Sequence, residues 1–205
     1  LSYLTEQINL MIYSLNAAEQ DRHVQMEKAR KIQEHLLPKY ETYERLNVAH
    51  LFEPAEEVGG DYFDVLQLSE DGYLLCLADV TGHGVPAAMA ATVMKALVLE
   101  AVQSSASPGE ILTLINQRYS NMIMPGHFAT MAILILDLPN HKITYSNAGH
   151  EPPLICQRNG EVIRLLEGGI VLGVDDQTIY TDATVRLKSH PKIVIASDGV
   201  TEAFD

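Results

Sequence analysis

The sequence divides at Pro38 into two parts of different character. The residues before it include neither proline nor glycine and are rich in Leu, Ala, Glu and Gln, whereas every glycine of the chain follows it. This composition predicts one uninterrupted helix from Leu1 to Leu37, which Pro38 ends because proline cannot donate a backbone hydrogen bond. We therefore expect a helical linker or dimerisation segment over residues 1–38 and a globular domain over residues 39–205.

Apolar residues recur along the predicted helix at spacings of three and four, in a heptad pattern that is interrupted at Arg22 and Gln25. Its members are Leu1, Leu4, Ile8, Met11, Leu15, Ala18, Ala29, Ile32 and Leu36. A narrow seam of this kind is typical of two parallel helices that pair with each other, so it predicts a homodimer through this helix. The alternative is a single helix that packs along its own domain.

The second part alternates short β-rich runs with turn signals from Val48 onward. Strands are predicted at 73–80, 130–138, 142–147, 153–157 and 192–197, and the turns at Asp71-Gly72, Pro139-Asn140 and Asn159-Gly160. Two helices are predicted between the strands. One runs from Pro86 to about Gln103, and the other runs to about Met122 after a capping box formed by Ser107 and Glu110. Strands, a helix pair and further strands indicate an α+β fold with mainly antiparallel sheets.

Charge and composition restrict the function. The formal net charge is -13, so the surface repels nucleic acid, and we expect no nucleic-acid partner. Cys76 and Cys156 lie in apolar runs, which predicts two buried free thiols in a reducing cytoplasm. The longest apolar run, at 85–102, is interrupted by Lys95 and Glu100, so no membrane span is expected.

Three acidic residues stand beside glycine where apolar runs meet turns. They are Asp61 in VGGDYFD, Asp79 in LADVTGHG and Asp198 in IVIASDGVTEAF. Carboxylates that converge repel one another, and burying each charge without compensation costs several kcal/mol. Divalent cations relieve this repulsion, and an all-oxygen ligand set favours magnesium, manganese or calcium over zinc. Each aspartate taken alone is better explained as a turn residue, so the prediction depends on all three meeting.

Six motifs in sequence order strengthen this interpretation. They are IQEHLLP at 32–38, VGGDYFD at 58–64, ADVTGHGVPAA at 78–88, FATM at 128–131, NAGHEPPL at 147–154 and SDGVTEAF at 197–204. Together they resemble the PPM (type 2C-like) metal-dependent protein serine/threonine phosphatases, in the bacterial RsbU/SpoIIE branch, from about Ala29 to the last residue. The resemblance implies two antiparallel β-sheets sandwiched between helices.

The same resemblance implies the chemistry and the residues that perform it. Asp61, Asp79 and Asp198 become metal ligands for two divalent cations, Mn²⁺ or Mg²⁺, with Asp79 bridging both ions. Val80 follows Asp79 where the family uses a backbone carbonyl as a ligand. Gly60 and the glycines at 82 and 84 shape the turns. The implied reaction is hydrolysis of phosphoserine or phosphothreonine by direct attack of a metal-bound hydroxide.

Two features depart from the family. A further metal-binding aspartate, expected near the family's C-terminus, has no counterpart up to Asp205. We therefore expect the C-terminal part of the domain to be missing, and a pseudo-phosphatase that binds a phosphoprotein without turnover remains the alternative function. The phosphate-gripping arginine of the type 2C enzymes of higher organisms also has no counterpart, as is general in the bacterial branch.

Two histidines lie in the motifs. His83 follows Asp79 by four residues and is a candidate catalytic acid for the leaving group, although a histidine that hydrogen-bonds a turn fits the pattern equally. His150, in NAGH, is expected to be structural.

The segment at 3–15, YLTEQINLMIYSL, resembles the end of a HAMP domain, the helical relay of bacterial receptors. This likeness implies a cytoplasmic output domain whose parent is anchored to the inner membrane through an upstream sensor region. The implied partner is a phosphorylated protein, with a STAS-domain anti-anti-sigma-type protein as the expected substrate.

Overall fold

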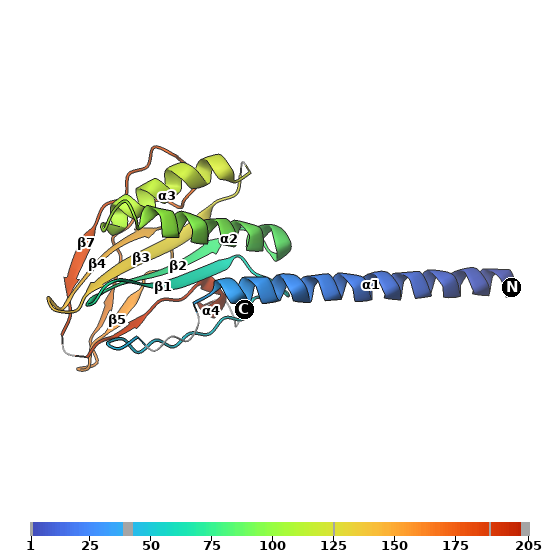
Figure 1. Cartoon of the computed structure of the whole chain (residues 1–205), viewed down its shortest axis with the longest axis horizontal. Coiled ribbons are helices and arrows are strands. Elements are labelled where there is room, and N and C mark those ends of the chain that lie inside the picture. Colours follow the sequence, from blue (N-terminus) through green and yellow to red (C-terminus); the bar gives the residue numbers. More distant parts are fainter. Residues whose placement is uncertain (1, 39–42, 125, 189, 202–205) are drawn as a thin grey trace.

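The computed structural model describes residues 2–38, 43–124, 126–188 and 190–201. A long helix, α1 (Ser2–Leu36), projects from a body in which two antiparallel sheets are stacked and two helices cover one of them (Figure 1). This architecture confirms the predicted α+β class with a long N-terminal helix.

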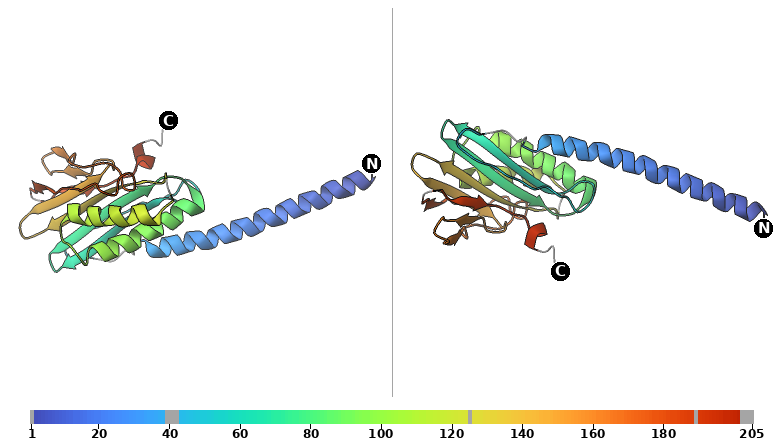
Figure 2. Two further views of the ribbon diagram at one scale, coloured as in Figure 1. Left: turned by 90° about the horizontal axis from the view of Figure 1, so that it is seen from above. Right: turned by 90° about the horizontal axis from the view of Figure 1, so that it is seen from below.

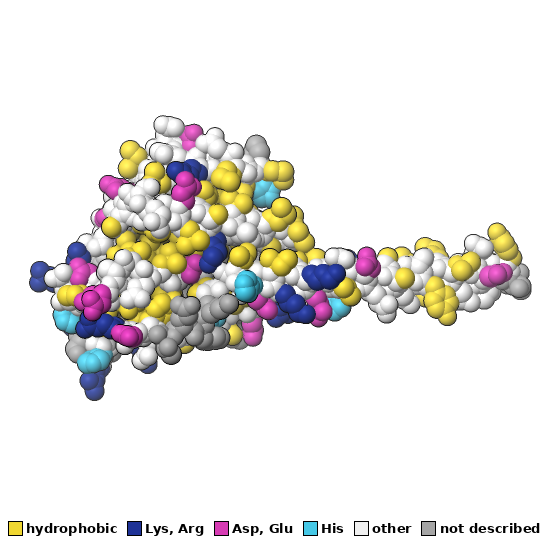
Figure 3. All heavy atoms as spheres, in the orientation of Figure 1, with side chains coloured by type: hydrophobic (Ala, Val, Ile, Leu, Met, Phe, Trp, Pro, Cys, Tyr) yellow, Lys and Arg dark blue, Asp and Glu magenta, His cyan; other side chains and the backbone are white. Residues whose placement is uncertain are grey.

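Helix α1 is almost wholly exposed. Leu4 and Met11 on the predicted seam are 61% and 64% exposed, and Figure 3 shows apolar side chains along the projecting part of the helix. Its C-terminal half contacts the body, where Gln33 is buried and Arg22 lies 3.9 Å from the Glu57 carboxylate. The helix ends before Pro38, as predicted. Most of the seam therefore does not pack along the domain, contrary to the alternative of a single helix that packs along its own domain. The homodimer stays a prediction.

The larger sheet has five strands in the order β1-β2-β3-β4-β7, and every neighbouring pair is antiparallel. The strands are β1 (Asp61–Ser69), β2 (Gly72–Val80), β3 (Ala129–Asp137), β4 (Lys142–Ala148) and β7 (Ala183–Arg186). The predicted Asp71-Gly72 turn connects β1 to β2. The sequence located β2, β3 and β4 but gave no bounds for β1 or β7, because polar residues in both weaken the apolar pattern.

The smaller sheet has three strands in the order β6-β5-β8. They are β5 (Leu154–Cys156), β6 (Val162–Arg164) and β8 (Lys192–Val194), each three residues long. Gly160 takes a φ of 87° in the predicted turn between β5 and β6, a backbone conformation that favours glycine. Strand β6 was not predicted, and β8 ends three residues earlier than expected.

Helices α2 (Gly84–Ala101) and α3 (Pro108–Met122) lie side by side over the larger sheet (Figures 1 and 2). Ser107 caps α3, its side chain accepting a hydrogen bond from the Glu110 amide. The Glu110 carboxylate accepts instead from the Ser105 hydroxyl at 2.6 Å, so only half of the predicted capping box is observed. Helix α2 starts two residues before Pro86 and ends at Ala101 rather than Gln103.

Alternate residues of the larger sheet face two separate apolar clusters. Tyr62 and Cys76 pack with Met94 beneath the helices, whereas Tyr73 and Ile155 belong to a cluster between the two sheets. Helix α2 has the length and apolarity of a membrane span, but its buried face packs in the first cluster, as a core helix does. Both cysteines are free, as predicted. Cys76 is buried, whereas Cys156 is partly exposed, which corrects the expectation that both thiols are buried.

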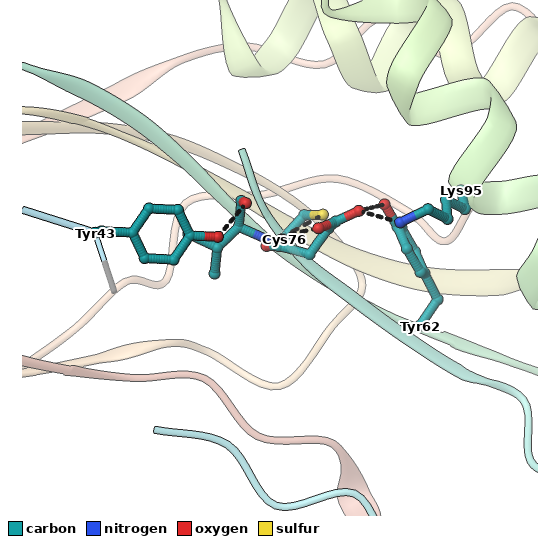
Figure 4. A network of polar contacts seen from close by, with 6 residues as sticks. Tyr43, Tyr62, Cys76 and Lys95 are labelled. Atoms are coloured by element: carbon teal, nitrogen blue, oxygen red, sulfur yellow. Dashed lines mark hydrogen bonds and ion pairs between the residues drawn. The ribbon is translucent and has the colours of Figure 1, made fainter. Parts of the chain in front are cut away.

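A buried ion pair fastens α2 to β1. Lys95 Nζ lies 2.7 Å from Asp64 Oδ2, and the Tyr62 hydroxyl donates to the same carboxylate oxygen at 3.1 Å (Figure 4). The Val65 amide donates to the other carboxylate oxygen at 2.9 Å. Burial, together with the nearby charge of Asp64, raises the pKa of the Cys76 thiol to about 12. These contacts hold the strand that begins with Asp61 against the helix layer.

Candidate metal centre

Asp61 and Asp79 are direct partners across β1 and β2. Asp61 is the first residue of β1, and its Cα pairs with that of Asp79 near the end of β2. Directly opposed residues of an antiparallel pair project from the same face, so the two carboxylates are neighbours. Tyr62 and Ala78 occupy the opposite, helix-covered face. The carboxylates therefore lie on the side of the smaller sheet.

Both carboxylates have raised pKa values, with burial as the largest cause. Burial raises the pKa of Asp79 to about 7, assisted by the charges of Asp61 and Asp198. Burial also raises the pKa of Asp61, opposed by a 2.8 Å hydrogen bond from the Ser197 hydroxyl and by a hydrogen bond with Asp79. Among the described residues, no lysine or arginine forms an ion pair with any of these aspartates. The pair therefore holds an excess of negative charge that a cation would neutralise.

Gly60 allows the backbone to approach this pair closely. A Cβ atom at Gly60 would lie 2.5 Å from the carbonyl oxygen of Val80, closer than real contacts allow. The Val80 amide donates to the Gly60 carbonyl at 3.3 Å. The carbonyl of Val80 thus lies beside the residue that precedes Asp61. Gly82, with a φ of 100°, then turns the chain toward α2.

Asp198 lies directly after the smaller sheet in the chain. It is the first residue of the short helix α4 (Asp198–Thr201), which follows β8, and its side chain is exposed. Its charge contributes to the raised pKa values of Asp61 and Asp79, so it lies within their electrostatic reach. Across the described ranges, however, no three acidic, histidine or cysteine side chains are gathered closely enough to hold one metal ion.

The three aspartates are therefore brought to one end of the sandwich, but Asp198 stands apart from the Asp61–Asp79 pair. The available donors are all oxygens, which suits magnesium or manganese. The Glu-Ala-Phe end of the SDGVTEAF motif, at 202–204, lies outside the described residues.

His83 is exposed at the N-terminus of α2. It occupies the N-cap position without a side-chain capping bond, and its Nδ1 lies 2.7 Å from Glu56 Oε1. The ring therefore contacts a carboxylate rather than the turn. Sequence reasoning assigned no role to Glu56, because it lies in an irregular segment outside every motif.

His150 is buried, in keeping with the structural role expected for it. Its Nδ1 lies 2.7 Å from the Thr130 hydroxyl, and burial lowers the pKa of the ring to about 4. Thr130 is the cross-strand partner of Asp79 on β3. The sequence analysis placed Thr130 in the FATM motif and Ser197 in the SDGVTEAF motif. It did not predict that Thr130 contacts His150 or that Ser197 contacts Asp61, because residues far apart in the sequence give no local sign of a contact.

Comparison with known proteins shows what the chain is similar to. The model of the family described as Stage II sporulation protein E (SpoIIE) matches residues 69–205. The phosphoserine phosphatase RsbU of Bacillus subtilis (strain 168) is 28% identical over 191 residues, which cover 92% of this chain and 57% of that protein. The chain therefore spans about half the length of the curated relatives it matches.

Solved structures show the same fold. The SiaA-PP2C domain of Pseudomonas aeruginosa matches with a TM-score of 0.79 and 23% identity, covering 89% of this chain and 74% of that chain. RsbX in complex with magnesium matches with a TM-score of 0.59 and 23% identity, covering 71% of this chain and 69% of that chain. At these identities the likeness concerns the fold alone.

Proposed function

The chain belongs to the SpoIIE family, and from this premise we propose that it is a metal-dependent protein serine/threonine phosphatase of bacterial signalling. The observation that carries the proposal is the pairing of Asp61 with Asp79 across two neighbouring strands, without a lysine or arginine partner among the described residues. A structural acid pair would be expected to have a basic partner, because two uncompensated carboxylates are costly to bury.

The proposed ligands for two cations, Mn²⁺ or Mg²⁺, are Asp61, Asp79 and Asp198, with the carbonyl of Val80. When bound, two such cations supply a water of lowered pKa and neutralise the charge of the phosphoryl oxygens. The chain supports them with a fixed pair of carboxylates on β1 and β2, a glycine that admits the Val80 carbonyl, and the Ser197 hydroxyl that orients Asp61.

We propose that His83 donates the proton that the departing serine or threonine oxygen requires. The ring lies four residues after Asp79 in an exposed turn, so an incoming protein can reach it. The Glu56 carboxylate at Nδ1 orients the ring and leaves Nε2 available to face the substrate.

A protein substrate suits this site because two of its proposed residues are open to a partner. The side chains of His83 and Asp198 are exposed, so a phosphorylated side chain on a folded protein can reach both. The similarity to a phosphoserine phosphatase supports this class, and a STAS-type protein that antagonises an anti-sigma factor is the proposed partner.

A second candidate is a pseudo-phosphatase that binds a phosphoprotein without turning it over. It is favoured by one observation, that Asp198 stands apart from the other two aspartates in the described part of the chain. Turnover with excess cation separates the two candidates, because a chain that only binds would retain the phosphoprotein unchanged.

We further propose that α1 forms a parallel helix dimer and that the chain is a cytoplasmic output module, linked in its parent to an inner-membrane sensor. The exposed heptad seam supports the dimer. Removal of residues 1–28 tests whether α1 dimerises and transmits a signal to the body. If the shortened chain has the same activity, the same metal affinity and the same number of chains per particle in solution, the helix neither dimerises nor regulates.

Phosphate release tests the enzymatic proposal. The chain is incubated with a phosphoserine-bearing STAS-domain protein or p-nitrophenyl phosphate, in Mn²⁺ or in EDTA. We expect Mn²⁺-dependent turnover that Asp79→Asn lowers by more than the 10–100-fold typical of residues outside the ligand set. Asp137→Asn, at the far end of β3, is the matched control. Full activity in Asp79→Asn would exclude the mechanism.

A further inference from the structure

Five apolar side chains are exposed where α2 begins and α3 ends. Their exposed fractions run from 39% for Phe128 to 68% for Met124. The members of this surface, which we call the methionine patch, are Val85, Met89, Met122, Met124 and Phe128. Figure 3 shows apolar side chains gathered at this end of the helix layer. Single exposed apolar residues are common on soluble proteins, whereas a group of them marks a surface that contacts a partner.

Hydrogen bonds join the methionine patch to the turn that follows Asp79. The Phe128 carbonyl accepts from the Thr81 amide at 3.0 Å and from the Thr81 hydroxyl at 2.9 Å. The Phe128 amide donates to the same hydroxyl at 3.1 Å. Thr81 comes two residues after Asp79, and Phe128 comes two residues before Thr130, the partner of Asp79 on β3. A bound protein covers about 800 Å² of its partner, so one that reached the Asp61–Asp79 pair would also cover Phe128.

The segments that carry the methionine patch hold no acidic residue. Neither 80–99 nor 111–136 contains aspartate or glutamate, although the chain has 27 acidic residues and a formal net charge of -13. The charged side chains of these segments are one lysine and one arginine. Glu56, which lies beside the start of α2, is paired with His83. A phosphorylated protein carries added negative charge, so the acidic surface of this chain would repel it, whereas the methionine patch would not.

We propose that the methionine patch is the surface on which the folded phosphoprotein substrate docks while its phosphorylated side chain reaches the Asp61–Asp79 pair. The inference rests on the proposed function, because the occupant is the substrate of the same site. Methionine side chains are flexible and polarisable, which lets them fit the apolar surface of a folded partner. A small phosphorylated molecule would not reach the patch, so the patch selects protein substrates.

A change of charge at one exposed methionine tests the proposal. Met124→Glu places an acid on the patch, whereas Met124→Lys places a base there. Turnover in Mn²⁺ is measured with the phosphoserine-bearing STAS-domain protein and with p-nitrophenyl phosphate. We expect Met124→Glu to raise KM for the phosphoprotein about tenfold more than KM for p-nitrophenyl phosphate, because an acid there repels the anionic partner and interrupts an apolar contact. Met124→Lys should raise KM for the phosphoprotein much less.

Two further variants separate docking from folding. Met89→Glu introduces the same charge on a different element of the patch and should raise KM for the phosphoprotein in the same way. Leu99→Glu is the matched control, because Leu99 is an exposed apolar residue at the opposite end of α2. This control should leave KM for both substrates at the wild-type value.

Several results would overturn the proposal. One is a wild-type KM for the phosphoprotein in both Met124→Glu and Met89→Glu. Another is a wild-type chain that hydrolyses p-nitrophenyl phosphate but neither binds nor hydrolyses the phosphoprotein, which would leave the metal-dependent hydrolysis standing. If light scattering shows that both variants dissociate a wild-type dimer without a change in this KM, the patch binds a second copy of the chain instead.

Failure of the proposed function gives a different result. A wild-type chain that hydrolyses neither substrate in Mn²⁺ is not a phosphatase. Calorimetric titration with the phosphoserine-bearing STAS-domain protein then decides the docking alone. Binding that Met124→Glu weakens about tenfold and Leu99→Glu leaves unchanged would support the patch, and equal binding in both variants would overturn it.

Discussion

The two sheets of the body differ in how firmly each is held. Strands β1, β2 and β3 of the larger sheet are nine residues long, and the helix layer covers one of its faces. The strands of the smaller sheet have three residues each, and Val162 and Val194 on them are about half exposed. The larger sheet therefore behaves as a frame, and the smaller sheet is attached to it mainly through Ile155 and its neighbours in the cluster between the sheets.

This difference divides the candidate metal centre. Asp61 and Asp79 belong to the frame, where ladder hydrogen bonds fix their separation. Asp198 belongs to the lightly held side, at the start of a four-residue helix. Two of the proposed ligands are thus placed by the fold itself, and the third depends on local contacts such as the hydrogen bond from Ser197 to Asp61. A centre built in this way is sensitive to the order of one short segment.

The largest expected contrast is between a fully buried isoleucine of the larger sheet and a partly buried isoleucine of the smaller sheet. Ile133→Ala removes a fully buried side chain beneath the helices and should cost about 3–4 kcal/mol of unfolding free energy. Ile193→Ala, in the partly exposed strand β8, should cost about 1 kcal/mol. Urea unfolding of the metal-free chain measures both. Equal losses would mean that the two sheets are equally well packed and would break the comparison.

Ion pairs provide the next contrast. Lys95→Ala leaves Asp64 buried without its cation, and we expect a loss of about 2–3 kcal/mol, since Tyr62 and the Val65 amide still serve the carboxylate. The matched variant is Lys188→Ala, which removes an exposed pair with Glu161 near the smaller sheet and should cost under about 1 kcal/mol. Similar losses in thermal unfolding would show that the buried pair does not fasten α2 to β1.

The frame was more predictable from sequence than the parts attached to it. The apolar runs of β2 and β3 and the helix signals at Pro108 and Ser107 are strong local patterns, and all were located. Strand β1 carries Asp61 and Asp64, two charges that weaken its apolar alternation, so its bounds could not be read from periodicity. Short strands such as β6 hold too few residues to show a period at all.

The candidate site was predictable as residue types and not as geometry. Asp61, Asp79 and Asp198 were identified because several motifs occur together and in order, since each aspartate beside glycine could by itself be a turn residue. The position of Asp198 relative to the pair is a tertiary property, and it has no local signature in the sequence. The Glu56 contact with His83 joins residues from different segments and was missed for the same reason.

The paired carboxylates of the frame should make stability depend on pH. A carboxyl whose folded pKa is raised stabilises the fold below its unfolded pKa near 4, and this contribution is lost as the pH rises through about 7 for Asp79. His150, with a lowered folded pKa, acts in the opposite direction between about pH 4 and 6.5. Because His150 titrates in both the wild type and Asp79→Asn, the difference between their unfolding free energies reports Asp79 alone.

We therefore compare Asp79→Asn with the wild type in EDTA. Asparagine mimics the protonated carboxyl, so the variant should match the wild type at pH 4 and exceed its stability by about 2 kcal/mol at pH 8, a value discounted for partial exposure. Urea unfolding at each pH gives the difference. A wild-type advantage that grows with pH would mean that Asp61 and Asp79 do not repel each other.

The smallest expected effect concerns the junction of α1 with the frame. The Gln33 side chain donates to the Gly59 carbonyl at 2.7 Å and accepts from the Gly59 amide at 3.2 Å, so one buried amide holds the backbone two residues before Asp61. Gln33→Ala should cost about 1 kcal/mol, because alanine favours the helix and offsets part of the lost hydrogen bonding. Gln25→Ala, on the exposed part of α1, should cost nothing measurable. If both variants unfold at the same urea concentration as the wild type, α1 is not anchored to the strand that carries Asp61 and does not belong to the frame.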